Sequence, residues 1–241
     1  MRAPVSAEQP EVTPTGHLDD VIGMWQVKQC IERSVLQPIR SSHGGDAAVS
    51  VPSGVLVHGA GGCGVSFIAR CLAEEIAAVP VPVTLIEDVD DLAGYGPGLA
   101  DRLFPSDGGR AIVVAASHRP WDLPDWMFGR GRIDRMVFVP PPDRDARRFR
   151  IWQLANAHRR DLDVIEPLLA ITEAWSGSDL DALFEDDELS WDDPPALAAE
   201  AARHRPGVLD WLASARSMAV FARSGVMVDD LSSYLQRFRL F

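Results

Sequence analysis

The sequence has little lysine, little cysteine and no long apolar segment. These shortages argue against lysine-dependent chemistry, a cysteine metal site and a membrane span, respectively. Only Lys28 of its 23 basic residues is a lysine, so almost no lysine is available for chemistry that needs one. The three cysteines (Cys30, Cys63 and Cys71) are an odd number without metal-ligand spacing, so we expect reduced thiols in a cytoplasm. No apolar run approaches the roughly 18–20 residues that span a bilayer, so we expect no integral membrane protein.

The remaining composition is that of an ordinary globular protein. The chain has 241 residues, 46% of them hydrophobic and 24% charged, which is enough to bury a substantial core. The formal net charge of −12 argues against a protein that binds nucleic acid through bulk positive charge.

The pattern along the chain predicts an α/β part followed by a helical part. Residues 1–16 are expected to form a polar, disordered tail rather than a signal peptide, and His17–Arg40 a helix. Alternating strands and helices imply a parallel sheet over residues 17–142, and residues 143–241 carry only helical patterns. The expected strands are 54–58, 82–90, 110–118 and 135–142.

Two surface features leave alternatives open. Residues 130–160 hold nine arginines against three aspartates, whereas residues 161–193 hold twelve acids and no lysine or arginine. These segments are either solvated helix faces or complementary edges of neighbouring subunits. Four tryptophans either mark an interface or pack in the cores: Trp121, Trp126, Trp175 and Trp191.

A glycine-rich turn between a strand and a helix is the clearest local motif, and it fits two phosphate-binding loops. Gly59, Gly61 and Gly64 match the dinucleotide fingerprint G-x-G-x-x-G, with Glu87 placed about twenty residues on to hold ribose hydroxyls, which would imply NAD(P). The same residues match a Walker A loop in which Val65 replaces the lysine and Ser66 supplies the hydroxyl. A purely structural glycine turn is the third interpretation.

The surrounding segments decide between these loops, because they resemble the classic clade of AAA+ ATPases from about His17 to Leu240. The resemblance implies an α/β P-loop-type sheet domain followed by a small helical lid. A dinucleotide dehydrogenase would explain none of the segments that carry it. They are LDDVIGMWQVKQCIERSVLQPIR, PSGVLVHGAGGCGVS, TLIEDVDDL, AIVVAASHRPWDLPDWMFGRGRIDRMVFVPPPDRDARRFRI, WSGSDLDAL and DWLASARSMAVFARSGVMVDDLSSYL, the last being similar to some bacterial members.

The resemblance also places the nucleotide-binding residues. It implies a loop of Gly59, Gly61, Gly62, Cys63, Gly64, Val65 and Ser66 that holds ATP or ADP with Mg²⁺. Val65 lacks the positive charge with which the family's lysine bridges the outer phosphates, so we expect weak binding or none. The metal ligands would be Ser66 and Glu87, if nucleotide binds at all.

Further departures concern catalysis. The family's Asp-Glu pair is reversed to Glu87-Asp88, which misplaces both the metal-binding acid and the base, Asp88. His118 stands at the sensor position that is normally asparagine, a change compatible with hydrogen bonding to water. Arg132 matches the second arginine finger and would act in trans on a neighbour's nucleotide, while the first finger is Gly129 unless Arg130 replaces it.

The spacing between these motifs is also unusual. Only twenty residues, 67–86, separate Ser66 from Glu87, whereas the family has an additional strand, a helix and an aromatic pore loop in this interval. The missing strand would lie at the sheet edge, so its loss would expose a new edge.

These features predict a degenerate AAA+ module, a pseudo-ATPase with a structural or regulatory role in a ring or filament. Its partners would be copies of itself, a related active subunit or other proteins. The alternatives are a slow ATPase and a dinucleotide-binding protein.

Overall fold

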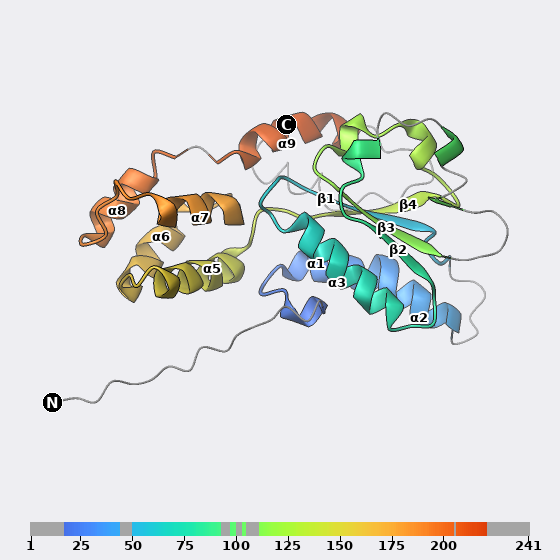
Figure 1. Ribbon diagram of the computed structural model, residues 1–241, viewed down its shortest axis with the longest axis horizontal. Helices are drawn as coiled ribbons and strands as arrows, with labels where there is room; N and C mark the ends of the chain where they lie inside the picture. The colour runs from blue at the N-terminus through green and yellow to red at the C-terminus, as the bar shows by residue number, and fades with distance from the viewer. Residues whose placement is uncertain are drawn as a thin grey trace.

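The computed structural model describes residues 17–43, 50–92, 97–99, 103–104, 111–204 and 206–220, so the expected tail at 1–16 lies outside it. Four parallel strands form one sheet in the order β2-β3-β1-β4 (Figure 1). The strands are β1 (Gly54–His58), β2 (Val83–Ile86), β3 (Ile112–Ser117) and β4 (Ile133–Phe138). The predicted parallel α/β fold is therefore confirmed, with all four strands within a few residues of their expected positions.

Both faces of the central strands β1 and β3 are buried, because their successive side chains enter different cores. Val55 and Val57 of β1 pack in the core that contains α3 (Val65–Ala77). Leu56 points to the opposite face, where short helical turns around Leu123 and Met127 cover the sheet. Burial on two sides explains the largely apolar sequences of the two central strands, β1 and β3.

The N-terminal helix begins later than the sequence predicts. It starts at Trp25 and runs to His43 as α1 (Trp25–Ile31), a π-helical turn (Glu32–Leu36) and α2 (Gln37–His43). Gly23 and Met24 have positive φ angles of 65° and 54°, which no right-handed helix contains. The predicted helical start at His17 is therefore wrong, because residues 17–24 form a short 3₁₀ turn and a left-handed entry.

A separate helical layer follows the sheet. It comprises α5 (Arg144–Ala157), α6 (Ile165–Ile171), α7 (Gly177–Glu185) and α8 (Pro194–Ala201), which share their own core and which we call the lid (Figure 1). The next helix, α9 (Val208–Val220), returns to the sheet, where Val208 and Leu212 join the first core. The expected boundary at residue 142 marks the start of the lid, but α9 packs with the α/β part.

The tryptophans and the charged segments are largely engaged within the chain. Trp175 is buried, Trp191 packs on Phe184 in the lid, and Trp121 and Trp126 pack against the two cores of the sheet. Glu166 pairs with Arg144 and Arg148, so the oppositely charged segments meet inside the lid. Among the described residues, no helix is both long and apolar enough to cross a bilayer.

Candidate nucleotide-binding site

The glycine loop connects β1 to α3 at the end of the sheet where the four parallel strands finish. Gly59 has no room for a side chain, because a Cβ there would overlap the carbonyl of Val139. Gly62 and Gly64 have φ angles of 76° and 87°, which favour glycine. The first amides of α3 follow directly, and such amides lack acceptors within their helix, so this geometry suits an anion.

The side chain of Val65 points into the protein interior. Its side chain is 1% exposed and belongs to the core shared by α3 and the sheet. A Cβ at Gly59 would stand 3.1 Å from Val65 Cγ2, so the valine packs against the strand exit. The next residue, Ser66, is half-buried. The position assigned to the phosphate-bridging lysine thus serves as packing.

The lid contacts the loop directly. The Gly177 amide, at the start of α7, donates a 2.9 Å hydrogen bond to the Gly62 carbonyl. A Cβ at Gly62 would lie 2.8 Å from the Cβ of Ser178 and 2.9 Å from the Oγ of Ser176. The loop and the lid therefore pack together at Gly62, where there is space for glycine alone.

Cys63 lies beneath this contact. Burial, and secondly the negative charge of Asp179, raise the pKa of the Cys63 thiol to about 12. Asp179 caps α7 by accepting hydrogen bonds from the backbone N–H and the hydroxyl of Ser176, and its other oxygen lies 3.0 Å from His204 Nε2. The carboxylate thus links α7 to the end of α8 immediately beside the loop.

The two acids that follow β2 point to local partners. Glu87 lies 3.4 Å from the Nε of Arg70 on α3, and both side chains are about half exposed. Asp88 is exposed and accepts a 3.1 Å hydrogen bond from the Asp90 amide. Neither acid is buried, and Glu87, the proposed metal ligand, forms an ion pair with Arg70.

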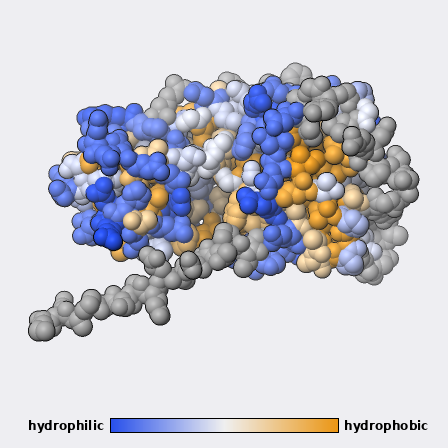
Figure 2. All heavy atoms as spheres, viewed as in Figure 1, coloured by the Kyte–Doolittle hydropathy of each residue, from blue (hydrophilic) through white to orange (hydrophobic). Residues whose placement is uncertain are grey.

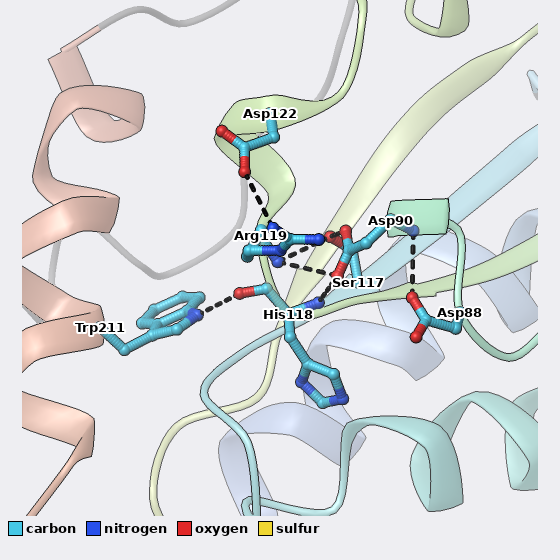
Figure 3. A network of polar contacts seen from close by, with 7 residues as sticks. All are labelled: Asp88, Asp90, Ser117, His118, Arg119, Asp122 and Trp211. Atoms are coloured by element: carbon cyan, nitrogen blue, oxygen red, sulfur yellow. Dashed lines mark hydrogen bonds and ion pairs between the residues drawn. The ribbon is translucent and has the colours of Figure 1, made fainter. Parts of the chain in front are cut away.

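Asp90 is the buried acid of this region, and sequence analysis did not single it out. Its carboxylate accepts hydrogen bonds from the Ser117 hydroxyl at 2.5 Å, the His118 amide at 2.7 Å and the Arg119 amide at 3.1 Å (Figure 3). It thereby joins the turn after β2 to the end of β3. Its place three residues after Glu87 in a strand-terminal acidic run was the only signal in the sequence.

His118 contacts both the loop and the C-terminal helix. Its Nδ1 lies 3.2 Å from the Gly59 carbonyl, and its own carbonyl accepts a 2.6 Å hydrogen bond from the Trp211 indole N–H (Figure 3). Trp211 also stacks on Phe138, with ring centroids 5.7 Å apart. The structure thus brings His118 to the glycine loop and adds α9 to the site, while its role as a sensor stays a prediction.

The candidate finger residues lie in a tight turn before β4. Gly129 and Gly131 have positive φ angles of 118° and 76° and bracket Arg130, which is exposed. The guanidinium of the half-buried Arg132 donates to the carbonyl of Trp126 in its own chain.

The described residues offer an incomplete set of ligands for a Mg²⁺–nucleotide complex. The loop amides and Ser66 suit phosphate oxygens, but Val65 supplies no positive charge and Glu87 is paired with Arg70. The described part of the chain contains no cluster of three or more His, Cys, Asp or Glu side chains placed to hold a metal ion. The residues present at Val65 and Glu87 therefore do not fit the Mg²⁺–nucleotide complex that the resemblance implies.

Comparison with known proteins finds relatives at about 25% sequence identity. The chain is 26% identical over 218 residues to meiotic spindle formation protein mei-1 of Caenorhabditis elegans, and 25% identical over 228 residues to the proteasome-activating nucleotidase of Pyrococcus abyssi. Protein SAV of Sulfolobus acidocaldarius is 24% identical over 221 residues. These matches cover 70–73% of this chain but only 28–56% of the relatives.

Solved structures agree in fold. The FIGL-1 AAA domain in complex with ADP matches with a TM-score of 0.63 at 21% identity, covering 84% of this chain and 90% of that one. A structure described as the basis for katanin self-assembly matches at 0.51 and 23% identity, covering 92% and 90%.

No protein-family model matches the chain. The chain is thus similar in sequence to AAA+ proteins and has the fold of the solved AAA domains, which agrees with the resemblance read from the sequence. These relatives are archaeal and eukaryotic, so the bacterial type remains a prediction.

Proposed function

We propose that this chain is a degenerate AAA+ module, a pseudo-ATPase that serves as a structural or regulatory subunit of an oligomer. The observation that carries the proposal is the burial of Val65 where the family's lysine would stand. A side chain that is 1% exposed and apolar cannot bridge the outer phosphates of ATP. Binding of ATP or ADP with Mg²⁺ would then depend on the loop amides and Ser66, and would be weak.

The acids after β2 support the same proposal. In an active site, a general base must lie within about 2.6–3.2 Å of its water, and a displacement of an ångström costs about a hundredfold in rate. Asp88 has one methylene fewer than glutamate at the base position, and Glu87 is held toward Arg70. Both departures weaken metal-assisted hydrolysis.

The short connection between α3 and β2 argues against a polypeptide-threading role. Helix α3 ends at Ala77 and β2 begins at Val83, so the described chain has no additional strand or helix between them. The family's aromatic pore loop would stand there. Without this loop, a role in assembly fits better than a role in unfolding substrates.

The proposed partners are further copies of this chain or related active AAA+ subunits. Support comes from the structural match to a protein solved for its self-assembly, katanin. Arg132 could act on a neighbour's nucleotide only after its guanidinium leaves the Trp126 carbonyl. A reducing, cytoplasmic location is part of the proposal and is supported by the three free thiols.

A slow ATPase is the alternative, in which Ser66 and Glu87 hold Mg²⁺, Asp88 acts as the base and His118 as the sensor. The contact of His118 with Gly59 is the observation in its favour. The dinucleotide-binding alternative gains no support, because the matched structures are AAA domains.

Phosphate release from Mg-ATP tests the proposal against the slow ATPase. We expect the full chain and its Asp88→Ala variant to release phosphate at the same background rate. Release that disappears in Asp88→Ala would overturn the pseudo-ATPase proposal. In parallel, oligomers should survive nucleotide removal and should weaken in Arg132→Ala.

A further inference from the structure

The edge of the sheet at β2 is open in the described structure. β2 pairs with β3 alone, in the register Val83 with Ile112 through Ile86 with Ala115. An unpaired edge presents backbone donors and acceptors to any strand that can reach it. Among the described residues, no strand between α3 and β2 pairs with this edge.

The direction of the backbone groups at this edge follows from the pairing with β3. The Pro82 carbonyl accepts a 2.8 Å hydrogen bond from the Ile112 amide. In a parallel ladder alternate residues bond to the same neighbour, so Thr84 and Ile86 also face β3. The N–H and C=O groups of Val83 and Leu85 consequently point to the open edge.

The prolines beside β2 do not block this edge. Pro82 belongs to the side that faces β3, to which its carbonyl is bonded, whereas Pro80 lies in the turn before the strand. Proline usually protects an edge by removing donors that point outward. Here the outward donors of Val83 and Leu85 remain.

The edge is also apolar. No residue from Ala77 to Ile86 carries a charge, and Val79, Val81, Val83, Leu85 and Ile86 are all only partly buried. Figure 2 shows hydrophobic surface over the part of the molecule where Figure 1 places β2, beside a hydrophilic band. The edge thus presents partly exposed apolar side chains that a neighbouring strand would bury.

We propose that β2 pairs antiparallel with β2 of a second copy of this chain, about a two-fold axis at Thr84. Val83 of each copy then stands opposite Leu85 of the other, and each such pair exchanges two main-chain hydrogen bonds. Thr84 faces Thr84 as a pair without main-chain hydrogen bonds, an arrangement in which threonines interact favourably. The two sheets become one continuous sheet of eight strands.

The charges favour a second copy as the occupant. Glu87 and Asp88 follow β2 directly, so a two-fold axis at Thr84 places the acids of the two copies at opposite ends of the paired strands, and acids do not meet acids. The apolar side chains that face α3, Val83 and Leu85, meet their counterparts on the same face. The strand is therefore complementary to itself, and two-fold contacts of this kind are the commonest in oligomers. This contact goes beyond the proposed function and does not depend on nucleotide.

Sedimentation velocity of the full chain across micromolar concentrations tests the contact. We expect a reversible dimer that Thr84→Lys weakens about tenfold or more, because two like charges then lie opposite each other. Gln26→Lys, an exposed change on α1, adds the same charge elsewhere and should leave the dimer intact. Equal melting temperatures will show that Thr84→Lys folds normally.

A cross-link tests the register. In a Cys30→Ser background, Thr84→Cys should form a disulfide-linked dimer under mild oxidation, because Cβ atoms in such a pair lie about 4.5–5.5 Å apart. Ile86→Cys lies on the same face but opposite the second copy's Pro82, and should not cross-link.

Three results would overturn the proposal: a wild-type monomer, a dimer that Thr84→Lys leaves unchanged, or equal cross-linking at both positions. If the β2 edge instead binds an extended segment of a different protein, the chain alone will be a monomer, and the proposal is overturned.

Discussion

The amide of Gly177 donates a hydrogen bond to the carbonyl of Gly62, and this contact fastens the lid to the glycine loop. Gly62 lies against the start of α7, where a Cβ at this position would overlap the side chains of Ser176 and Ser178. The loop that resembles a phosphate-binding site is thus also the place where the lid contacts the α/β part.

The fit at Gly62 predicts graded effects of alanine substitution along the loop. Gly61→Ala should be nearly neutral, because its Cβ meets nothing within 4 Å. Gly64→Ala should cost about 1–2 kcal/mol through its positive φ alone. Gly62→Ala should cost more, about 2–4 kcal/mol, since it adds a clash with α7. Urea unfolding of the three variants checks this order, and equal losses at Gly62 and Gly64 would contradict the contact.

Asp90 and Asp88 should differ sharply in their contribution to stability. Asp90→Ala removes the acceptor of three hydrogen bonds, among them that of the buried Ser117 hydroxyl, and should cost about 3 kcal/mol or more. Asp88→Ala removes one exposed acceptor and should cost below about 1 kcal/mol. Thermal unfolding compares the two, and a larger loss in Asp88→Ala would show that the roles are assigned wrongly.

Trp211 should stabilise the site through both its ring and its N–H. Trp211→Phe keeps an aromatic ring against Phe138 but removes the hydrogen bond to His118, so it should cost about 1–2 kcal/mol. Trp211→Ala also removes the stacking and should cost about 3 kcal/mol or more. Amide hydrogen exchange at residues 117–119 should accelerate in both variants. Unchanged exchange there would mean that α9 does not support this turn.

Asp134 should make the protein less stable as pH rises through the acidic range. Burial raises the pKa of its carboxyl above the ordinary value for aspartate, although the Ser53 amide and the charge of Arg135 partly offset this. The unfolded chain then loses its proton first and binds fewer protons than the folded chain. Stability therefore falls from the unfolded pKa up to the raised folded pKa.

Asp134→Asn should lack that part of the pH dependence. The free energy of unfolding of the variant, relative to wild type, should increase between about pH 4 and the pH at which the folded carboxyl ionises. Urea unfolding at several pH values measures the difference, and a constant or opposite trend would contradict the raised pKa.

Much of the fold could be predicted from residues 54–142, because strands buried on both faces must be continuous apolar runs. The sequence also pointed to His118 as a candidate site residue, and its contact with the Gly59 carbonyl is found only in the folded chain. It could not predict the start of the first helix, where Met24 adopts a left-handed conformation and donates to Asp143, 119 residues away. The return of α9 to the sheet was missed for the same reason, since Trp211 finds its partners only in the folded chain.

The predicted chemistry of the site depends on Val65, and equilibrium binding of a fluorescent ATP analogue with Mg²⁺ tests it most directly. Wild type and Val65→Lys should be measured side by side, with melting temperatures as a check on folding. We predict that wild type binds weakly or not at all and that the lysine variant gains affinity. Binding by wild type at micromolar levels or better, unchanged in Val65→Lys, would contradict the disabled phosphate site.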